Sequence, residues 1–247
     1  MNTMRDHNTD RIRNQTQYGY DNCVVIADLD GTLIDSDTSI ADIITGVLRE
    51  FGFGKEHVRL AYECLENGRS GDEATMVFGL DREKRMKIEE RLKSELLKRT
   101  YNPVPEVHKS LASLKEDGFE FAIATANYAD NTMRVLKETG LDAFFKQELV
   151  FTYDNFHAKK PSAEVTAEIM KRSGRTNAVV VGNTAKDILF ARNSGLPVVL
   201  IKSSAVNEYD GLDCLAGELA GYPTSDGWRT VPDIVKKLMN DRKSTGA

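Results

Sequence analysis

The feature that most constrains this chain is the stretch CVVIADLDGTLIDSD at residues 23–37. Its first five residues are apolar, and they run directly into two acids, Asp28 and Asp30. A short unbroken apolar run predicts a strand that is buried on both faces, as in a parallel sheet. Open α/β sheets bind their ligands beyond the carboxyl ends of the strands, where these two carboxylates would lie. We therefore interpret residues 22–28 as the strand that carries the active site.

Composition excludes several classes of function. The chain has 247 residues, 40% of them hydrophobic, which is enough for a large core or for a core with a smaller added unit. A net charge of −5 gives no indication of a nucleic-acid partner. No apolar run approaches the roughly 20 residues that cross a bilayer, so we expect no membrane partner. The cysteine count is odd with no metal-binding spacing, and the polar N-terminus contains no secretory segment, which favours a cytoplasmic protein.

The hydropathy pattern divides the rest of the chain into three parts. Residues 1–21 are polar and predict a tail or a loosely docked arm. Residues 38–102 have apolar residues at helical spacing and no strand candidate, which predicts an all-helical insert. Residues 22–37 and 103–247 alternate strands with helices, the pattern of βαβ units in a parallel sheet. The predicted fold class is therefore α/β with an inserted helical unit.

The expected elements are bounded by glycine and proline residues. The predicted strands cover residues 22–28, 119–125, 148–152, 178–181 and 198–201. The predicted helices cover residues 39–51, 55–66, 72–78, 81–99, 104–116, 128–139, 161–173, 185–194 and 231–239. Pro161 is expected in the first turn of its helix, where proline is tolerated. Residues 203–230 are polar and rich in glycine, and their pattern predicts no element.

The residues that follow the first four predicted strands are mostly polar. They are Asp28 and Asp30, then Thr125, Ala126 and Asn127, then Lys159 and Lys160, and finally Asn183 and Asp187. Basic and hydroxyl groups beside helix N-termini suit a phosphoryl group, and clustered hard oxygens suit Mg²⁺. Simpler structural roles stay open: an acid can cap a turn, Asn127 can cap a helix, and Asp187 can be a first-turn acid.

These residues carry a resemblance to a known family. DLDGTLIDSD, residues 28–37, resembles the first motif of the haloacid dehalogenase-like hydrolases, most of which are phosphatases. Thr125, Lys160 in KKPS, and GNTAKDILFARNSGLPVV at 182–199 are similar to the other three motifs of that family, in the same order. The resemblance implies a Rossmann-like parallel-sheet core with the first strand central. It also implies that residues 38–102 form an all-helical cap domain of the C1 type.

The resemblance also implies separate catalytic roles for the strand-end residues. Asp28 would be the nucleophile that forms an aspartyl-phosphate, and Asp30 would be the general acid and then the general base. Thr125 and Lys160 would hold the phosphoryl oxygens together with Ala126 and Asn127. The adjacent Lys159 is an alternative to Lys160 for this role. An acid at position 30 favours phosphoryl transfer over dehalogenation, because a halide leaves without a proton.

The implied cofactor is Mg²⁺, with Asp28, Asp30, Asn183 and Asp187 as its candidate ligands. In the family the backbone carbonyl of the second motif acid contributes to the metal, and the residue at position 183 is normally Asp. The Asn183 amide keeps an oxygen ligand but loses a formal charge. We therefore expect weaker Mg²⁺ affinity than in a site with the usual carboxylate.

The sequence thus predicts a Mg²⁺-dependent phosphatase that hydrolyses a small phosphorylated metabolite through an aspartyl-phosphate intermediate. One alternative is a phosphotransferase or phosphomutase of the same family. Another is a phosphoryl-binding regulatory protein, which the loss of the acid at position 183 suggests. The chain would act as a monomer or a homodimer, and nothing in the sequence identifies the substrate.

Overall fold

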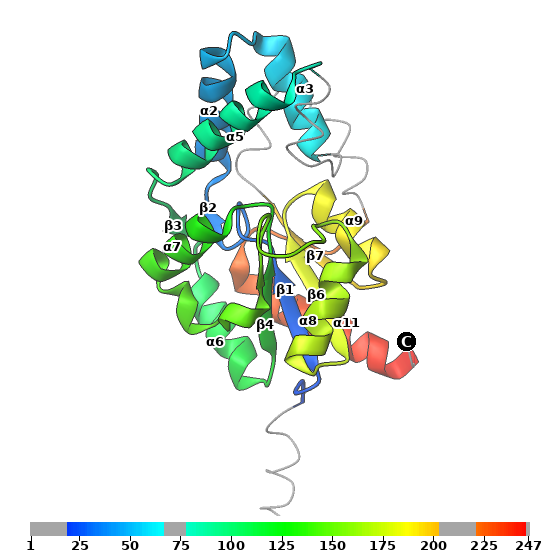
Figure 1. Ribbon diagram of the computed structural model, residues 1–247. Helices are drawn as coiled ribbons and strands as arrows, with labels where there is room; N and C mark the ends of the chain where they lie inside the picture. The colour runs from blue at the N-terminus through cyan, green and yellow to red at the C-terminus, as the bar shows by residue number, and fades with distance from the viewer. Residues whose placement is uncertain (1–18, 67–77, 203–220, 246–247) are drawn as a thin grey trace, which may run out of the picture.

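The computed structural model describes residues 19–66, 78–202 and 221–245 (Figure 1). Most of the predicted arm at 1–21, most of the predicted helix at 72–78 and most of residues 203–230 lie outside these ranges. The described residues contain a six-stranded parallel sheet in the order β5-β4-β1-β6-β7-β8. The strands are β1 (Cys23–Ala27), β4 (Glu120–Ala124), β5 (Val150–Phe151), β6 (Asn177–Gly182), β7 (Val198–Ile201) and β8 (Thr224–Ser225).

Strand β1 lies in the interior of the sheet, as the sequence predicts. Ile26 pairs with Ala122 of β4 on one side and with Val180 of β6 on the other. All five residues of β1 are buried, because both faces of a parallel sheet are covered by helices. The strand order also brings the carboxyl ends of β1, β4 and β6 side by side at one edge of the sheet.

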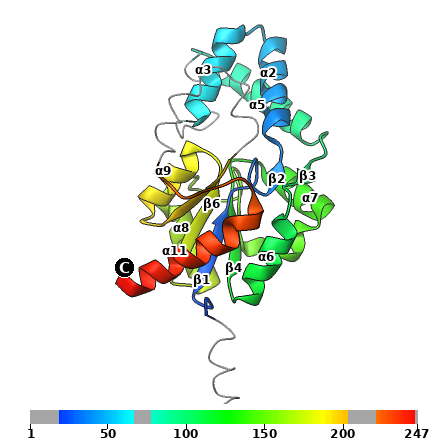
Figure 2. The ribbon, with the colours of Figure 1, turned by 180° about the vertical axis from the view of Figure 1, so that it is seen from behind.

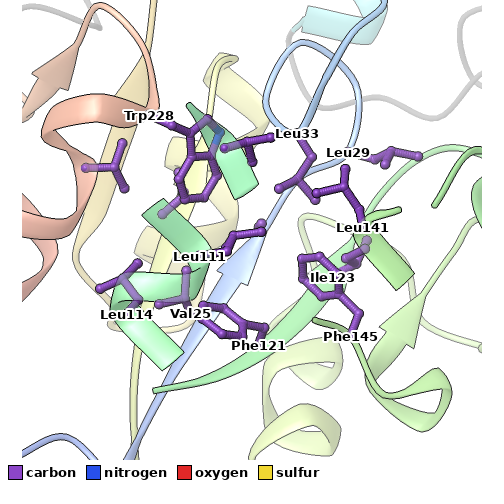
Figure 3. Close-up of a cluster of buried hydrophobic side chains, with 14 of the residues drawn as sticks. Val25, Leu29, Leu33, Leu111, Leu114, Phe121, Ile123, Leu141, Phe145 and Trp228 are labelled. Carbon is purple, nitrogen blue, oxygen red and sulfur yellow. The ribbon is translucent and has the colours of Figure 1, made fainter. Parts of the chain in front are cut away.

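Helices cover both faces of the sheet (Figures 1 and 2). One face packs against α6 (Val107–Glu116), α7 (Ala129–Thr139) and α11 (Val231–Thr245), and the other against α8 (Ala163–Ser173) and α9 (Ala185–Asn193). Figure 3 shows the core of the first face, where Val25 of β1 lies among Leu111, Phe121 and Ile123. No helix within the described ranges is long and apolar enough to cross a membrane.

Three further helices of the described ranges form a unit beyond the carboxyl end of the sheet (Figure 1). They are α2 (Asp37–Glu50), α3 (Lys55–Glu66) and α5 (Arg82–Leu96). The buried apolar residues of this unit form a cluster of their own: Ile43, Val47, Leu48, Val58, Ala61 and Ile88. The chain enters and leaves the unit through one antiparallel pair of short strands, β2 (Ile34–Asp35) and β3 (Asn102–Pro103).

Several element boundaries differ from the prediction. Helix α6 begins at Val107 and not at residue 104, because the Val104 N–H donates to the Leu33 carbonyl and Glu106 adopts a left-handed conformation with φ 66°. Strand β5 has only two residues, and the segment before it is a 3₁₀ turn, η2 (Gln147–Leu149). Strands β2, β3 and β8 were not predicted, since two residues are too few to show a strand period.

The ends of two later helices also differ. Helix α8 begins at Ala163, with Ser162 as its N-cap, so Pro161 precedes the helix and does not lie in its first turn. The Ser162 hydroxyl accepts from the Glu164 N–H and satisfies one of the free donors at this terminus. Helix α11 continues six residues beyond the predicted end at Met239, to Thr245.

Trp228 connects the C-terminal segment to the loop after β1 through a hydrogen bond. It lies in the 3₁₀ helix η4 (Trp228–Thr230), and its side chain is fully buried beside Leu33 (Figure 3). The indole Nε1 donates to the Thr32 carbonyl at 2.6 Å, and the Ser110 hydroxyl donates to the Trp228 carbonyl at 2.8 Å. A residue from a segment with no predicted element thus supports the strand-end loop that carries Asp30.

We expect Trp228→Phe to lower the free energy of unfolding by about 1–3 kcal/mol, because the buried Thr32 carbonyl loses its donor. Urea denaturation measures this loss. Tyr20→Phe is the control, since the Tyr20 hydroxyl donates to Asn240 at an exposed position, and we expect a loss below about 0.5 kcal/mol. Equal losses in the two variants would contradict a supporting role for the indole N–H.

Candidate active site

The candidate site is built at the carboxyl ends of three adjacent strands. Asp28 follows β1, Thr125 follows β4 and Asn183 follows β6. The Asp28 N–H donates to the Val181 carbonyl and the Thr125 N–H to the Phe151 carbonyl, both at 2.9 Å. These bonds continue the pattern of the sheet, so the positions of the two side chains are fixed by the strands themselves.

Lys160 joins two of the predicted acids. Its Nζ lies 2.9 Å from Asp28 Oδ1 and 2.7 Å from Asp187 Oδ1. It also donates to the Ala124 carbonyl, one residue before Thr125, at 3.2 Å. The Lys160 side chain is 3% exposed, that of Asp28 10% and that of Asp187 0%. The ammonium group is therefore the shared partner of two carboxylates in a largely dehydrated setting.

Lys159, the other candidate for this role, lies elsewhere. It is exposed, and its Nζ sits 3.4 Å from the ring centroid of Tyr153, a cation–π contact. Among the predicted phosphoryl-binding residues, Thr125 is buried and its Oγ1 accepts from the Asn127 N–H at 3.0 Å. Ala126 is exposed between them. The structure thus singles out Lys160 as the lysine beside Asp28.

Burial and nearby charges shift the pKa values of Asp28 and Asp187, the two partners of Lys160, in opposite directions. Burial raises the pKa of Asp28 to about 7, and the nearby Asp187 and Asp30 add to this shift while Lys160 opposes it. Burial would also raise the pKa of Asp187, but Lys160 and the hydrogen bonds from Thr184 hold it below its usual value. Burial would lower the pKa of Lys160, but Asp187 and Asp28 outweigh burial and raise it. Lys160 therefore stays charged and Asp187 is its firm counter-ion.

Asp187 is fixed by its own loop. Its Oδ2 accepts from the Asn183 N–H at 3.1 Å, the Thr184 N–H at 3.0 Å and the Thr184 hydroxyl at 2.9 Å. Its carboxyl lies against Gly182, where an added Cβ would stand 2.1 Å from Cγ of Asp187. The first-turn position considered for this acid is therefore present in α9, and the same carboxylate also orients Lys160.

Asp30 is held by two donors, one on each oxygen. The Ser36 hydroxyl donates to Oδ1 at 2.8 Å, and the Asn127 amide donates to Oδ2 at 3.0 Å. Asn127 is buried, and its own Oδ1 accepts from Asn131 at 3.1 Å. Burial raises the pKa of Asp30, whereas the bonds from Asn127 and Ser36 oppose the shift. The N-cap of α7 is Tyr128, and Asn127 Oδ1 also accepts from the Tyr128 N–H at 2.8 Å. Asn127 is therefore held at the start of α7 while its amide nitrogen contacts Asp30.

Asn183 has a partner at each end of its amide. Its Oδ1 accepts from the Thr32 hydroxyl at 3.2 Å, and its Nδ2 donates to Asp37 Oδ2 at 3.0 Å. Sequence reasoning missed Thr32, Ser36 and Asp37 as members of the site. Their signal was present, because all three belong to the polar stretch that follows β1.

The donor chemistry of the site fits Mg²⁺. Within the described ranges, no three His, Cys, Asp or Glu side chains are arranged to hold a metal ion, so the oxygen donors would be mixed. Asp28 supplies a carboxylate and Asn183 an amide oxygen, and carbonyl oxygens are equally suitable ligands. Lys160 contacts the carboxylates of Asp28 and Asp187, and Asp37 lies close enough to Asp30 to raise its pKa. A divalent cation would offset the negative charge of the carboxylates gathered here. The side-chain oxygens of Asp187 are already engaged by Lys160 and the loop.

This arrangement can carry out covalent and acid–base chemistry. A buried carboxylate that is oriented by a lysine is a nucleophile for an electrophilic centre. A second carboxylate with a raised pKa, two residues along the chain, can donate and accept a proton. The lysine and a strand-end hydroxyl can stabilise oxygens that gain charge during the reaction.

Comparisons with known proteins agree with this geometry. Residues 25–201 match the family described as haloacid dehalogenase-like hydrolase. The pyrophosphatase PpaX of Halalkalibacterium halodurans is 29% identical over 189 residues, which cover 72% of this chain and 82% of that protein. A phosphoglycolate phosphatase of Aquifex aeolicus is 26% identical over 179 residues, which cover 72% and 83% of the two chains.

Solved structures share the fold. The crystal structure of CbbY from Rhodobacter sphaeroides in complex with phosphate superposes with a TM-score of 0.63 at 16% identity, covering 85% of this chain and 96% of that one. The residues that match the family, 25–201, contain the last three residues of β1, strands β4 and β6, and the helical unit between β1 and β4. The chain therefore belongs to the haloacid dehalogenase-like hydrolases.

Proposed function

We propose that this phosphoric monoester hydrolase releases phosphate from a small phosphorylated metabolite, with Asp28 as nucleophile and Mg²⁺ as cofactor. The observation that carries the proposal is the buried contact between Asp28 and Lys160, with Asp30 held two residues along the chain by Ser36 and Asn127. This set supplies a nucleophile, a group that transfers a proton and a fixed positive charge at one edge of the sheet.

In the first step, an Asp28 oxygen attacks phosphorus and the bond from phosphorus to the leaving oxygen breaks. Asp30 gives its proton to the leaving oxygen, a role that suits a carboxyl whose pKa is raised by burial. In the second step, water attacks the aspartyl-phosphate, Asp30 takes the proton of the water, and inorganic phosphate leaves Asp28. The Thr125 hydroxyl and the Lys160 ammonium stabilise the phosphoryl oxygens in both steps.

Asp28, the Asn183 amide oxygen and the Asp30 carbonyl would hold Mg²⁺. When bound, the ion offsets the repulsion between the attacking carboxylate and the phosphate. Asp187 acts on the site through Lys160, to which it is bonded at 2.7 Å. This assignment narrows the four candidate ligands of the sequence to three direct ones and one supporting acid.

The helical unit of α2, α3 and α5 is proposed as a cap that covers the substrate. Its helix α5 contacts the N-terminal end of α7, where the Tyr128 hydroxyl donates to Glu89 at 3.0 Å and Lys93 pairs with Asp130 at 3.2 Å. Relatives named pyrophosphatase and phosphoglycolate phosphatase support a small phosphorylated substrate. The proposed setting is the cytoplasm, with the protein as a monomer or homodimer and no nucleic-acid partner.

A panel of phosphorylated metabolites tests the proposed function. We expect Mg²⁺-dependent release of inorganic phosphate from at least one compound, and loss of that release when EDTA removes the metal. Transfer of the phosphoryl group to a second metabolite without phosphate release would favour a phosphotransferase. Binding of compounds with neither outcome would favour a regulatory protein and would overturn the proposal.

The role of Asp30 gives a separate prediction. With an alkyl phosphate ester, Asp30→Asn is expected to lower kcat by about 10²–10⁴-fold, because the leaving alkoxide needs a proton. With p-nitrophenyl phosphate, whose leaving group departs unprotonated, the same variant is expected to give a fast burst of nitrophenolate stoichiometric with enzyme. Turnover after the burst is slow, since Asp30 also activates the water.

Asp35→Asn is the matched control for that experiment. Asp35 belongs to the same motif but is exposed in β2, and we expect wild-type kinetics with both substrates. Rapid-quench measurement of nitrophenolate and phosphate separates the two steps. An Asp30→Asn variant without a burst, or with equal losses for both leaving groups, would contradict the assignment of Asp30 as the acid.

A further inference from the structure

We propose that Asp37 fixes the orientation of the Asn183 amide, so that the amide presents its oxygen and not its NH₂ group to the cation of the active site. Asp37 is then a positioning residue that acts through Asn183. This inference rests on the proposed function, because it assumes that the site binds Mg²⁺. It explains how an amide can replace a carboxylate at this position.

An amide ligand, unlike a carboxylate, has two chemically different ends. Both ends of a carboxylate are oxygens, but a side-chain amide that rotates by 180° about its terminal bond exchanges an acceptor for a donor. With the NH₂ group toward the cation, Asn183 would repel the metal. An amide ligand therefore needs neighbours that allow only one of its two orientations.

The two hydrogen bonds of Asn183 provide that selection. An ionised carboxylate is only an acceptor, so the group that faces Asp37 Oδ2 at 3.0 Å must be Nδ2. The flipped amide would place two oxygens in contact there. At the other end, the Thr32 hydroxyl donates to Asn183 Oδ1 at 3.2 Å, and among the described residues this bond occupies one of the two acceptor sites of Oδ1. The second acceptor site of Oδ1 is then available to a cation.

The contact is enclosed by the backbone of the first motif. Gly31 has φ +68°, and an added Cβ there would lie 2.1 Å from Asn183 Nδ2 and 2.2 Å from Asp37 Oδ1. The amide and the carboxylate therefore meet against the α-carbon of this glycine, where no side chain could fit. Asn183 is 7% exposed, so few water molecules can compete for its amide.

Asp37 also restores the charge that Asn183 lacks. It is the first residue of α2, where the helix dipole favours an ionised acid. It lies close enough to Asp30 to contribute to the raised pKa of that carboxyl. A helix-dipole role alone would explain an acid at position 37 but would not require its contact with Asn183, and the following experiment separates the two roles.

The experiment is a double-mutant cycle on Mg²⁺ affinity, measured by isothermal titration calorimetry on the full chain without substrate. Asp37→Asn is expected to weaken Mg²⁺ binding by about 10- to 100-fold, the range seen when partners that orient metal ligands are removed. In the Asn183→Asp background there is no amide to orient, and Asp37 faces a second carboxylate. Asp37→Asn is then expected to strengthen binding or leave it unchanged, because the pair again joins one amide to one carboxylate.

Weakening by Asp37→Asn in the wild-type background that disappears or changes sign in the Asn183→Asp background is the result that identifies orientation. Asp42→Asn removes an exposed acid from the same helix and is expected to change the affinity by less than about twofold, as for a screened surface charge. Melting temperatures measured with EDTA verify that each variant is folded. Equal weakening by Asp37→Asn in both backgrounds would assign Asp37 a purely electrostatic role and overturn the proposal, as would no effect in the wild-type background.

Failure of this inference can be told apart from failure of the proposed function. Wild-type protein that binds Mg²⁺ and releases phosphate, but whose Mg²⁺ affinity does not respond to Asp37→Asn, overturns the orientation role alone. Wild-type protein that neither binds Mg²⁺ nor releases phosphate overturns both. Phosphate release is therefore measured on the same preparations.

Discussion

Replacing Asp28 with Asn is expected to lower phosphate release by at least about 10⁴-fold while the fold is retained. An amide cannot form the aspartyl-phosphate, and removal of a nucleophile that acts with its partners lowers kcat on this scale. The fold should tolerate the change, because Lys160 keeps its contact with Asp187 at 2.7 Å. Phosphate release on the best substrate of the panel, with Mg²⁺ at saturation, is the measurement.

The same variant has an expected signature in stability without metal. Burial raises the pKa of Asp28 to about 7 in the folded protein, from an ordinary value near 3.9. A raised pKa means that the ionised carboxylate destabilises the fold, and this effect grows as the pH rises from about 4 to 7. In EDTA, Asp28→Asn should therefore increase the melting temperature relative to wild type at pH 8, with little difference at pH 4. An Asp28→Asn variant that is less stable than wild type at pH 8 would contradict the raised pKa of Asp28. A variant that retains activity would contradict its role as nucleophile.

Five of the six strands in the described sheet were predictable from the sequence because they are apolar runs between glycine and polar residues, whereas the two-residue strand β8 was not. The run at 23–27 becomes β1, and the residues after β1, β4 and β6 meet because parallel strands align their carboxyl ends. Strands β2 and β3 were not predictable, since each has two residues and depends on the other. The start of α6 was also set by a distant contact, from the Val104 N–H to the Leu33 carbonyl.

The site was predictable as far as residue type and strand-end position define it. Lys160 and Lys159 could not be separated by sequence, because their difference is that one is buried beside Asp28 and the other stacks on Tyr153. In the sequence, Asp37 stood out only as the last residue of the stretch 28–37 that resembles the first motif. Its contact with Asn183 spans 146 positions in the chain, and only the folded sheet brings the two residues together.

Lys160→Met is expected to have the second large effect, on both stability and activity. The substitution removes the positive partner of two buried acids, Asp28 and Asp187. Removing one partner of a buried ion pair costs about 3–5 kcal/mol of the free energy of unfolding, and Asp187, which is fully buried, would keep its charge without a counter-ion. Loss of a preorganised positive group should also lower kcat by about 10²–10³-fold. Guanidinium denaturation and phosphate release measure the two effects separately.

Lys159→Met provides the control, because it removes the same charge from the adjacent, exposed position. Lys159→Met is expected to change the free energy of unfolding by no more than about 0.5 kcal/mol and to leave kcat near the wild-type value.

A Lys160→Met/Asp187→Asn double variant separates the effect on stability from the effect on catalysis. Replacing the unpaired Asp187 carboxylate should recover part of the lost free energy of unfolding, because an amide can be buried without a counter-ion. Activity should stay low, since the ammonium that would stabilise the phosphoryl oxygens is still missing. Recovery of activity together with stability would mean that Lys160 supports the fold alone and does not contact the reacting group.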